Sequence, residues 1–179
     1  MLWEIDNSWT LFLDRDGVIN QRIIDDYVKT IDEFKFIRGA ETAIAEMSKI
    51  FRFVFVVTNQ QGIGKGIMTE SNLVEIHTYM TDQIQTEGGQ ITACYYAPQL
   101  ASEGSELRKP STGMGIKAQQ DFEGVDFLRS IMVGDSDSDI EFGKRLGMKT
   151  VKVSTDGTDS SGADLVVKDL SELLNRIGI

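Results

Sequence analysis

The chain has 179 residues and a formal net charge of −10, from 18 Lys and Arg against 28 Asp and Glu. One cysteine excludes an intramolecular disulfide framework, and one cysteine with one histidine cannot build a zinc finger or a three-histidine zinc centre. The acidic balance argues against a general binder of nucleic acid or anionic membranes, and no apolar run reaches the roughly 18–20 residues of a transmembrane helix. The first residues lack the basic segment of a signal peptide, so we expect a cytoplasmic protein.

Short apolar runs alternate with helical patterns along the whole chain. In chain order the patterns predict a strand at 9–13, a helix at 39–50, a strand at 51–58, a helix at 69–85, a strand at 91–96, a strand at 130–134, a helix at 137–146, strands at 150–153 and 165–167, and a helix at 169–177. Most of the strands lack polar alternation, as strands buried on both faces do. This order predicts an α/β fold, a doubly wound three-layer sandwich with a mostly parallel sheet, in one domain spanning 1–179.

Ligands of such sheets bind beyond the carboxyl ends of the strands, so polar residues at these ends are the candidates for chemistry. Asp14 and Asp16 leave the first predicted strand, and Asp16-Gly17 is also an ordinary turn pair. Thr58 and Asn59 end the second strand, where a hydroxyl and backbone N–H groups suit a phosphate oxygen. Alone, either segment can be a plain loop.

The later strand ends add cations and further carboxylates. A glycine-rich run at 62–66 lacks the spacing of a nucleotide-binding loop. Arg108-Lys109-Pro110 can neutralise a phosphate or form a solvated turn. Asp135, Asp137 and Asp139 crowd three carboxylates after the fourth strand, and a cation or a helix N-terminus must offset their repulsion. An oxygen-only set of this kind favours Mg²⁺ over zinc.

Together these strand-end motifs resemble those of the haloacid dehalogenase-like (HAD) superfamily of phosphatases. The stretches that carry the resemblance are FLDRDGVIN at 12–20, YVKTIDEFKFIRGA at 27–40, VVTNQQGIGKG at 56–66, RKP at 108–110 and VGDSDSD at 133–139. They are similar to the subgroup that holds heptose-bisphosphate phosphatases and histidinol-phosphate phosphatases. The resemblance covers roughly residues 11–153.

The resemblance implies a reaction through an aspartyl-phosphate. Asp14 is then the nucleophile, and Asp16 is the general acid for the leaving group and afterwards the base for water. Mg²⁺ is expected on the carboxylates of Asp14 and Asp135 and on the backbone carbonyl of Asp16. Asp139 is expected to support Lys109 or a metal-bound water; the motif leaves open whether Asp137 also touches the metal.

The same resemblance implies the substrate contacts. Thr58, Asn59 and Lys109 are expected to hold phosphoryl oxygens as charge shifts during the reaction. Arg108 is the candidate for substrate recognition, and Arg15 and Gly17 are further candidate contacts in the first loop. The intervals after the first two strands are too short for a cap domain, so the loop at 97–109 is expected to shape access to the site.

One departure from the subgroup concerns zinc. Heptose-bisphosphate phosphatases of this kind usually carry a Cys/His zinc loop before the Arg-Lys-Pro segment. Here Ala97 and Gln99 stand where the first Cys and His would be, and the later Cys pair is missing. We therefore expect no structural zinc, and a loop held by packing.

These observations favour a Mg²⁺-dependent phosphomonoesterase of a small sugar phosphate, most similar to the heptose-bisphosphate enzymes, with histidinol phosphate as the alternative substrate. A polynucleotide 3′-phosphatase would use the same chemistry, but the net charge opposes it. A phospho-receiver module needs an aspartate after the third strand, where this chain has Tyr95-Tyr96-Ala97. We expect a monomer with a small phosphorylated ligand and no nucleic-acid or membrane partner.

Overall fold

The computed structural model describes residues 3–178, whose centre is one six-stranded parallel sheet. The strands are β1 (Thr10–Leu13), β2 (Phe53–Asn59), β3 (Ala93–Ala97), β4 (Ser130–Gly134), β5 (Lys149–Val153) and β6 (Leu165–Val167), in the order β3-β2-β1-β4-β5-β6. The strand order reverses direction between β1 and β4, so the carboxyl ends of these two strands form the switch point at which doubly wound sheets bind ligands. The predicted α/β fold with a parallel central sheet is confirmed.

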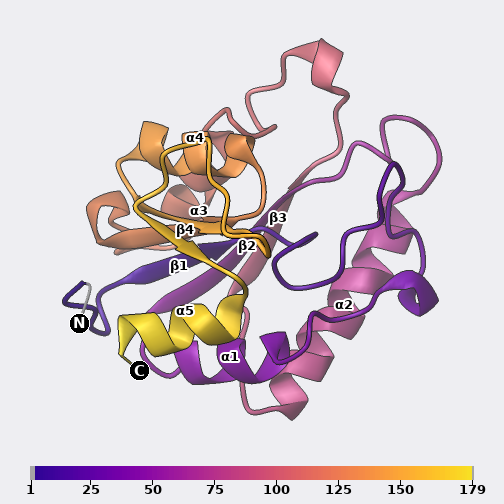
Figure 1. Cartoon of the computed structure of the whole chain (residues 1–179). Helices are drawn as coiled ribbons and strands as arrows, with labels where there is room; N and C mark the ends of the chain where they lie inside the picture. Colours follow the sequence, from indigo (N-terminus) through magenta and orange to yellow (C-terminus); the bar gives the residue numbers. More distant parts are fainter. Residues whose placement is uncertain (1–2, 179) are drawn as a thin grey trace.

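Helices cover both faces of the sheet (Figure 1). The helices α1 (Ala40–Met47), α2 (Glu70–Thr86) and α5 (Leu170–Ile177) pack on one face, and α3 (Gly113–Asp121) and α4 (Asp137–Leu146) pack on the other. Three short 3-10 helices join them, at Ile31–Glu33, Ala101–Glu103 and Phe127–Arg129. The result is the three-layer sandwich that the sequence pattern predicts.

Two apolar cores explain why the strands lack polar alternation. Along β1, Leu11 and Leu13 point into the core beneath α1, α2 and α5, whereas Phe12 points into the core beneath α3 and α4. All three side chains are fully buried. Because each face of the sheet meets a helical layer, the inner positions of the central strands are apolar, and polar residues such as Thr10, Thr58 and Ser130 lie near the strand ends.

Local signals set most of the helix ends. Thr69 caps α2 by accepting a hydrogen bond from the backbone N–H of Asn72, whose side chain reaches back to the N–H of Thr69. Gly147 ends α4 in the left-handed region, at φ 79°. The helix α3 has no counterpart among the predicted elements; the sequence analysis missed it.

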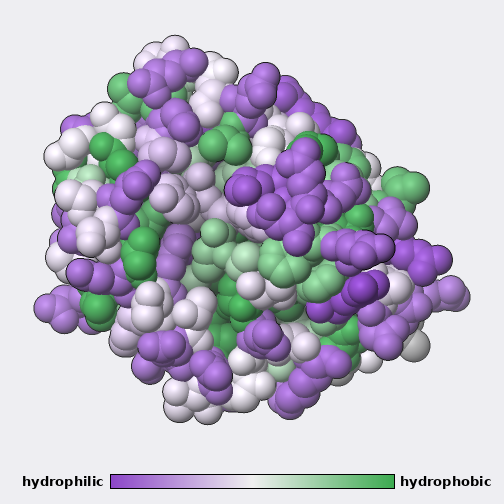
Figure 2. Space-filling view, turned by 180° about the vertical axis from the view of Figure 1, so that it is seen from behind, coloured by the Kyte–Doolittle hydropathy of each residue, from purple (hydrophilic) through white to green (hydrophobic). Residues whose placement is uncertain are grey.

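The outer surface is mostly hydrophilic, as the acidic composition requires. Figure 2 shows apolar patches between hydrophilic side chains on the face seen from behind. Within residues 3–178, no helix is both long and apolar enough to cross a membrane.

Candidate active site

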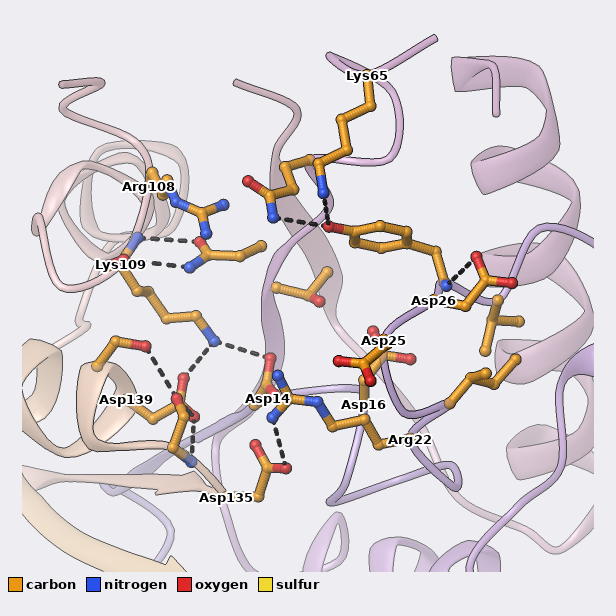
Figure 3. Close-up of a pocket in the computed structure, with 18 residues that line it drawn as sticks. Asp14, Asp16, Arg22, Asp25, Asp26, Lys65, Arg108, Lys109, Asp135 and Asp139 are labelled. Atoms are coloured by element: carbon orange, nitrogen blue, oxygen red, sulfur yellow. Dashed lines mark hydrogen bonds and ion pairs between the residues drawn. The ribbon is translucent and has the colours of Figure 1, made fainter. Parts of the chain in front are cut away.

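Six carboxylates and four cations line one cavity of about 430 Å³ at the carboxyl ends of the strands (Figure 3). The ten charged side chains there are Asp14, Asp16, Asp25, Asp26, Asp135, Asp139, Arg22, Lys65, Arg108 and Lys109. Thr58 and Asn59 also line it. Of the residues expected at the site, Arg15 and Gly17 do not line the cavity, and neither does Asp137.

Asp14 lies at the centre of the site, where its backbone continues the hydrogen bonding between β1 and β4. Its N–H donates to the carbonyl oxygen of Val133 on β4 at 2.9 Å, directly beyond the pairing of Leu13 with Val133. The residue is 7% exposed. Burial raises the pKa of Asp14 to about 7, and the Asp139 and Asp135 charges add to the rise, against the opposing charge of Lys109.

Lys109 places a buried ammonium between two of the carboxylates. Its Nζ lies 2.8 Å from Asp14 Oδ1 and 2.6 Å from Asp139 Oδ1, and it donates to the carbonyl oxygen of Val57 at 2.6 Å. Burial would lower the pKa of Lys109, but the Asp139 and Asp14 charges outweigh it and raise the pKa. Lys109 therefore stays charged and offsets part of the negative charge around Asp14.

Asn59 holds Lys109 in place through its backbone. The Asn59 side chain accepts from the Lys109 N–H at 3.0 Å and donates to the Lys109 carbonyl oxygen at 3.1 Å. Asn59 therefore has a structural role besides its predicted contact with phosphate: it docks the loop at 98–112 against the end of β2.

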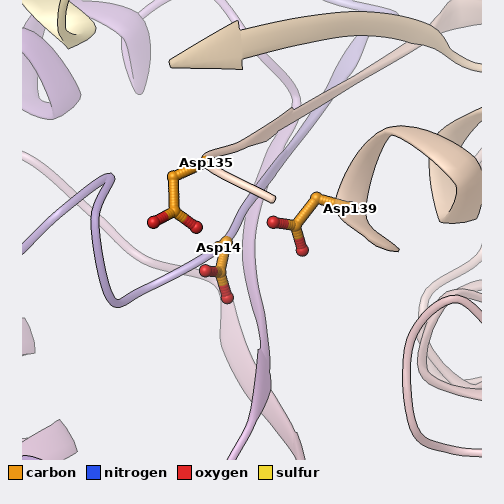
Figure 4. Close-up of side chains that lie close together, drawn as sticks. All are labelled: Asp14, Asp135 and Asp139. Carbon is orange, nitrogen blue, oxygen red and sulfur yellow. The ribbon is translucent and has the colours of Figure 1, made fainter. Parts of the chain in front are cut away.

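Three carboxylates form a candidate metal site (Figure 4). Asp14, Asp135 and Asp139 each offer an oxygen, and these atoms lie within 4.8 Å of one another. Asp139 is already held by Lys109 and by the N–H and hydroxyl of Ser136, at 3.0 and 2.6 Å. Asp14 and Asp135 could therefore hold a metal ion, with Asp139 beside them.

The protonation behaviour of these ligands fits a hard divalent cation. Burial raises the pKa of Asp135, with a further contribution from Asp139, against Arg22 at 3.2 Å. The raised pKa values of Asp14 and Asp135 show that Lys109 and Arg22 offset only part of the cost of their negative charge, and Mg²⁺ would offset more of it through the oxygen ligands that it prefers. Asp137 points elsewhere, because its carboxylate pairs with Lys152 at 2.9 Å and its side chain is 65% exposed.

Asp16 is held by three donors. Arg15 donates to both of its oxygens at 2.9 Å, Asn20 donates to Oδ1 at 2.9 Å and Gln60 donates to Oδ2 at 2.8 Å. Burial would raise the pKa of Asp16, but the Arg15 charge and these hydrogen bonds outweigh it and lower the pKa. Arg15 is fully buried beneath Asp16, so the predicted contact with substrate is replaced by a contact with Asp16.

Gly17 supports the site by leaving space for Asp135. A Cβ at this position would lie 2.1 Å from Asp135 Oδ2, and the backbone has φ +91°, which side-chain-bearing residues rarely adopt. The contact predicted between Gly17 and substrate is not part of the cavity; the glycine instead permits the close approach of two loops.

Several further residues complete the site, and the sequence patterns did not predict them. Arg22 and Lys65 bring cations from loops, and Tyr27 stacks under Lys65, whose Nζ lies 5.2 Å from the ring centre. Gln60 directly follows Asn59, so its place at a strand end was the available signal. No local pattern marks Arg22, since it meets Asp135 only in the folded chain.

This arrangement, an Asp-x-Asp segment after β1 facing a lysine and a carboxylate after β4, defines the site of a HAD-type phosphoryl hydrolase. The family model for HAD-hydrolase-like proteins matches residues 106–173. A solved structure of D,D-heptose 1,7-bisphosphate phosphatase from B. bronchiseptica, complexed with magnesium and phosphate, has 29% identity and a TM-score of 0.85, covering 94% of this chain and 97% of that one.

Curated relatives agree with the fold comparison. The D-glycero-alpha-D-manno-heptose-1,7-bisphosphate 7-phosphatase of Mycobacterium bovis is 33% identical, over 96% of this chain and 93% of the relative. The D-glycero-beta-D-manno-heptose-1,7-bisphosphate 7-phosphatase of Pseudomonas aeruginosa is 37% identical, over 81% and 80%. The chain therefore belongs to the family of D-glycero-D-manno-heptose-1,7-bisphosphate 7-phosphatases within the HAD superfamily.

Proposed function

We propose that this protein removes the 7-phosphate of D-glycero-D-manno-heptose-1,7-bisphosphate by way of an aspartyl-phosphate on Asp14. One observation supports this most directly, namely the buried Lys109 ammonium held between Asp14 and Asp139 beside Asp135. It places a carboxylate nucleophile and a phosphate-binding cation at the floor of one cavity. When bound, Mg²⁺ on Asp14, Asp135 and the Asp16 carbonyl would screen the repulsion between nucleophile and phosphate.

The reaction divides into two displacements at phosphorus. In the first, an Asp14 oxygen attacks, the bond to the sugar oxygen breaks, and Asp16 gives a proton to the departing alkoxide. In the second, Asp16 takes a proton from water, which attacks the aspartyl-phosphate and releases inorganic phosphate and free Asp14. Lys109 and Thr58 hold phosphoryl oxygens in both steps.

The rim of the cavity supports a substrate with a second anionic group. Arg22 and Lys65 line the opening, and Arg108 is half-buried with an Nη1 that no residue in 3–178 accepts from. An unpartnered buried donor is costly, and a phosphate oxygen is the acceptor that a guanidinium suits best. We assign Arg108 to substrate recognition, and the protein acts as a monomer in the cytoplasm in this proposal.

A phosphate-release panel tests the substrate. It compares the alpha and beta anomers of the heptose bisphosphate, histidinol phosphate and a 3′-phosphorylated oligonucleotide, each with Mg²⁺ and with a chelator. The proposal expects one heptose anomer to have the highest kcat/KM, because the relatives divide between the two anomers. A higher kcat/KM on histidinol phosphate or the oligonucleotide would overturn the substrate assignment while leaving the chemistry in place.

A further inference from the structure

A buried glutamine links Asp16 and Thr58, two of the groups that the proposed reaction uses. Gln60 follows β2, is fully buried, and is fixed to β3 by its N–H, which donates to the Ala97 carbonyl oxygen at 2.8 Å. Its Nε2 donates to Asp16 Oδ2 at 2.8 Å and to Thr58 Oγ1 at 2.9 Å. Both amide hydrogens are therefore used inside the site.

The chemistry of the neighbours fixes the orientation of this amide. An ionised carboxylate only accepts hydrogen bonds, so the nitrogen of Gln60, and not its oxygen, must face Asp16. The second amide hydrogen then reaches Thr58 Oγ1, which must accept it. The hydroxyl hydrogen of Thr58 has to point elsewhere, and no residue in the described chain, 3–178, accepts it.

We infer that Gln60 is a positioning residue that holds the Asp16 carboxylate for proton transfer and turns the Thr58 hydroxyl towards a phosphoryl oxygen. Thr58 lines the cavity, so its free hydrogen has the bound phosphate as its acceptor. Gln60 does not line the cavity and touches no substrate; it acts through its two partners. This inference rests on the proposed function for the roles of Asp16 and Thr58.

The test is Gln60→Leu, which removes the amide and keeps a side chain of similar size. Misplacing catalytic groups by about 1 Å can cost about 100-fold in rate, and we expect kcat on a sugar phosphate to fall about 10- to 100-fold with little change in KM. The matched control is Gln85→Leu, which removes an exposed amide from α2, far from the site in sequence and contact. It should keep the wild-type kcat.

Two readouts separate positioning from a merely structural role. An aryl phosphate such as p-nitrophenyl phosphate has a leaving group that needs no proton, so the part of the loss that comes from Asp16 as the acid should vanish on it, and the total loss should be smaller than on a sugar phosphate. The part that comes from Thr58 should remain on both substrates. In a Thr58→Val background, Gln60→Leu should cause a smaller further loss on the aryl phosphate than it does in the wild type, because the hydroxyl that it orients is gone.

Several outcomes would overturn the inference. An equal loss on sugar and aryl phosphates that also adds in full to that of Thr58→Val would show a general structural defect. A Gln60→Leu protein with the wild-type kcat would show that the amide has no role. If Gln60→Leu does not fold, Gln60→Glu keeps the shape and sets a carboxylate against Asp16, and it should lose at least as much.

Failure of the proposed function would be visible separately. If the wild-type protein released phosphate from neither substrate, the assignment of Thr58 is still tested by calorimetric binding of inorganic phosphate with Mg²⁺. Gln60→Leu should then weaken phosphate binding about as much as Thr58→Val does. Unchanged binding in Gln60→Leu, beside weakened binding in Thr58→Val, would contradict the inference.

Discussion

Replacing Lys109 with methionine tests whether its buried ammonium balances the carboxylates around it. Lys109 is 3% exposed and contacts Asp14 and Asp139 at 2.8 and 2.6 Å. Methionine places an unbranched, adaptable side chain in the same space, so the lost charge is the main change. The variant leaves Asp14, Asp135 and Asp139 facing one another without the ammonium between them, although Arg22 still contacts Asp135.

The magnitude follows from their spacing. The ligand atoms of the three carboxylates lie within 4.8 Å of one another, and one pair of unit charges at that distance repels by about 3.5 kcal/mol at an effective dielectric constant of about 20. Removing one partner of a buried ion pair costs about 3–5 kcal/mol in other proteins. We therefore expect Lys109→Met to lower the free energy of unfolding by about 3–5 kcal/mol at neutral pH without Mg²⁺.

The loss should depend on pH in a definite direction. Burial already raises the pKa of Asp14 to about 7 from an ordinary 3.8, and removing the Lys109 charge raises it further. Such a group binds its proton more tightly in the folded protein than in the unfolded one, so stability falls as pH rises through the folded pKa. Above pH 7 the variant continues to lose stability until the pH passes its own higher Asp14 pKa, so its deficit should be larger there than at pH 7.

Urea unfolding at several pH values, with a chelator present, measures this. Lys117→Met is the matched control, because Lys117 is 56% exposed on α3 beside Asp121 and should change stability by less than about 1 kcal/mol. Saturating Mg²⁺ should restore part of the lost stability in Lys109→Met. A Lys109 variant within about 1 kcal/mol of the wild type at every pH would refute the charge-balance reasoning.

Two further substitutions and one metal analysis test separate parts of the site. Asp16→Asn should lower kcat on sugar phosphates about 10²- to 10⁴-fold, and a smaller loss on p-nitrophenyl phosphate would mark the missing acid; equal losses would argue against that role. Gly17→Ala should raise the Mg²⁺ concentration needed for half-maximal activity, since its Cβ would lie 2.1 Å from Asp135 Oδ2; an unchanged Mg²⁺ titration would contradict the close approach. Metal analysis of the purified protein should find no stoichiometric zinc, and one zinc per chain would overturn the interpretation of Ala97 and Gln99.

The strands were predictable because burial on both faces produces short apolar runs without polar alternation in the sequence. The runs at β4 and β6 were predicted with the bounds that the structure has, and the other strands differ by one or two residues at their ends. The helix α3 escaped because its sequence, GMGIKAQQD, has two glycines and few apolar residues. Gly115 is there for packing, since a Cβ would lie 2.5 Å from Leu146 Cδ1 on the neighbouring helix.

The site residues also differ in how far local sequence signals could predict them. Asp14 and Asp135 directly follow β1 and β4, so the sheet alone brings them together, whereas Lys109 reaches them from the long loop after β3. Arg22 lies in a loop more than a hundred residues away in sequence from its partner Asp135, and no local sequence pattern predicts their contact. Arg15 lies in the predicted loop, but the rotation of its side chain beneath Asp16 is decided by burial and by the Asp16 charge, which only the folded chain supplies.

In the proposed reaction, Asp14 is the group that receives the phosphate. Acid quenching of the protein during turnover with Mg²⁺ and heptose bisphosphate, followed by mass spectrometry of its peptides, measures this directly. We expect the mass of one phosphoryl group on the peptide that holds Asp14, and neither that mass nor phosphate release in Asp14→Asn. Steady turnover by Asp14→Asn, or a phosphoryl group on a different residue, would contradict the account.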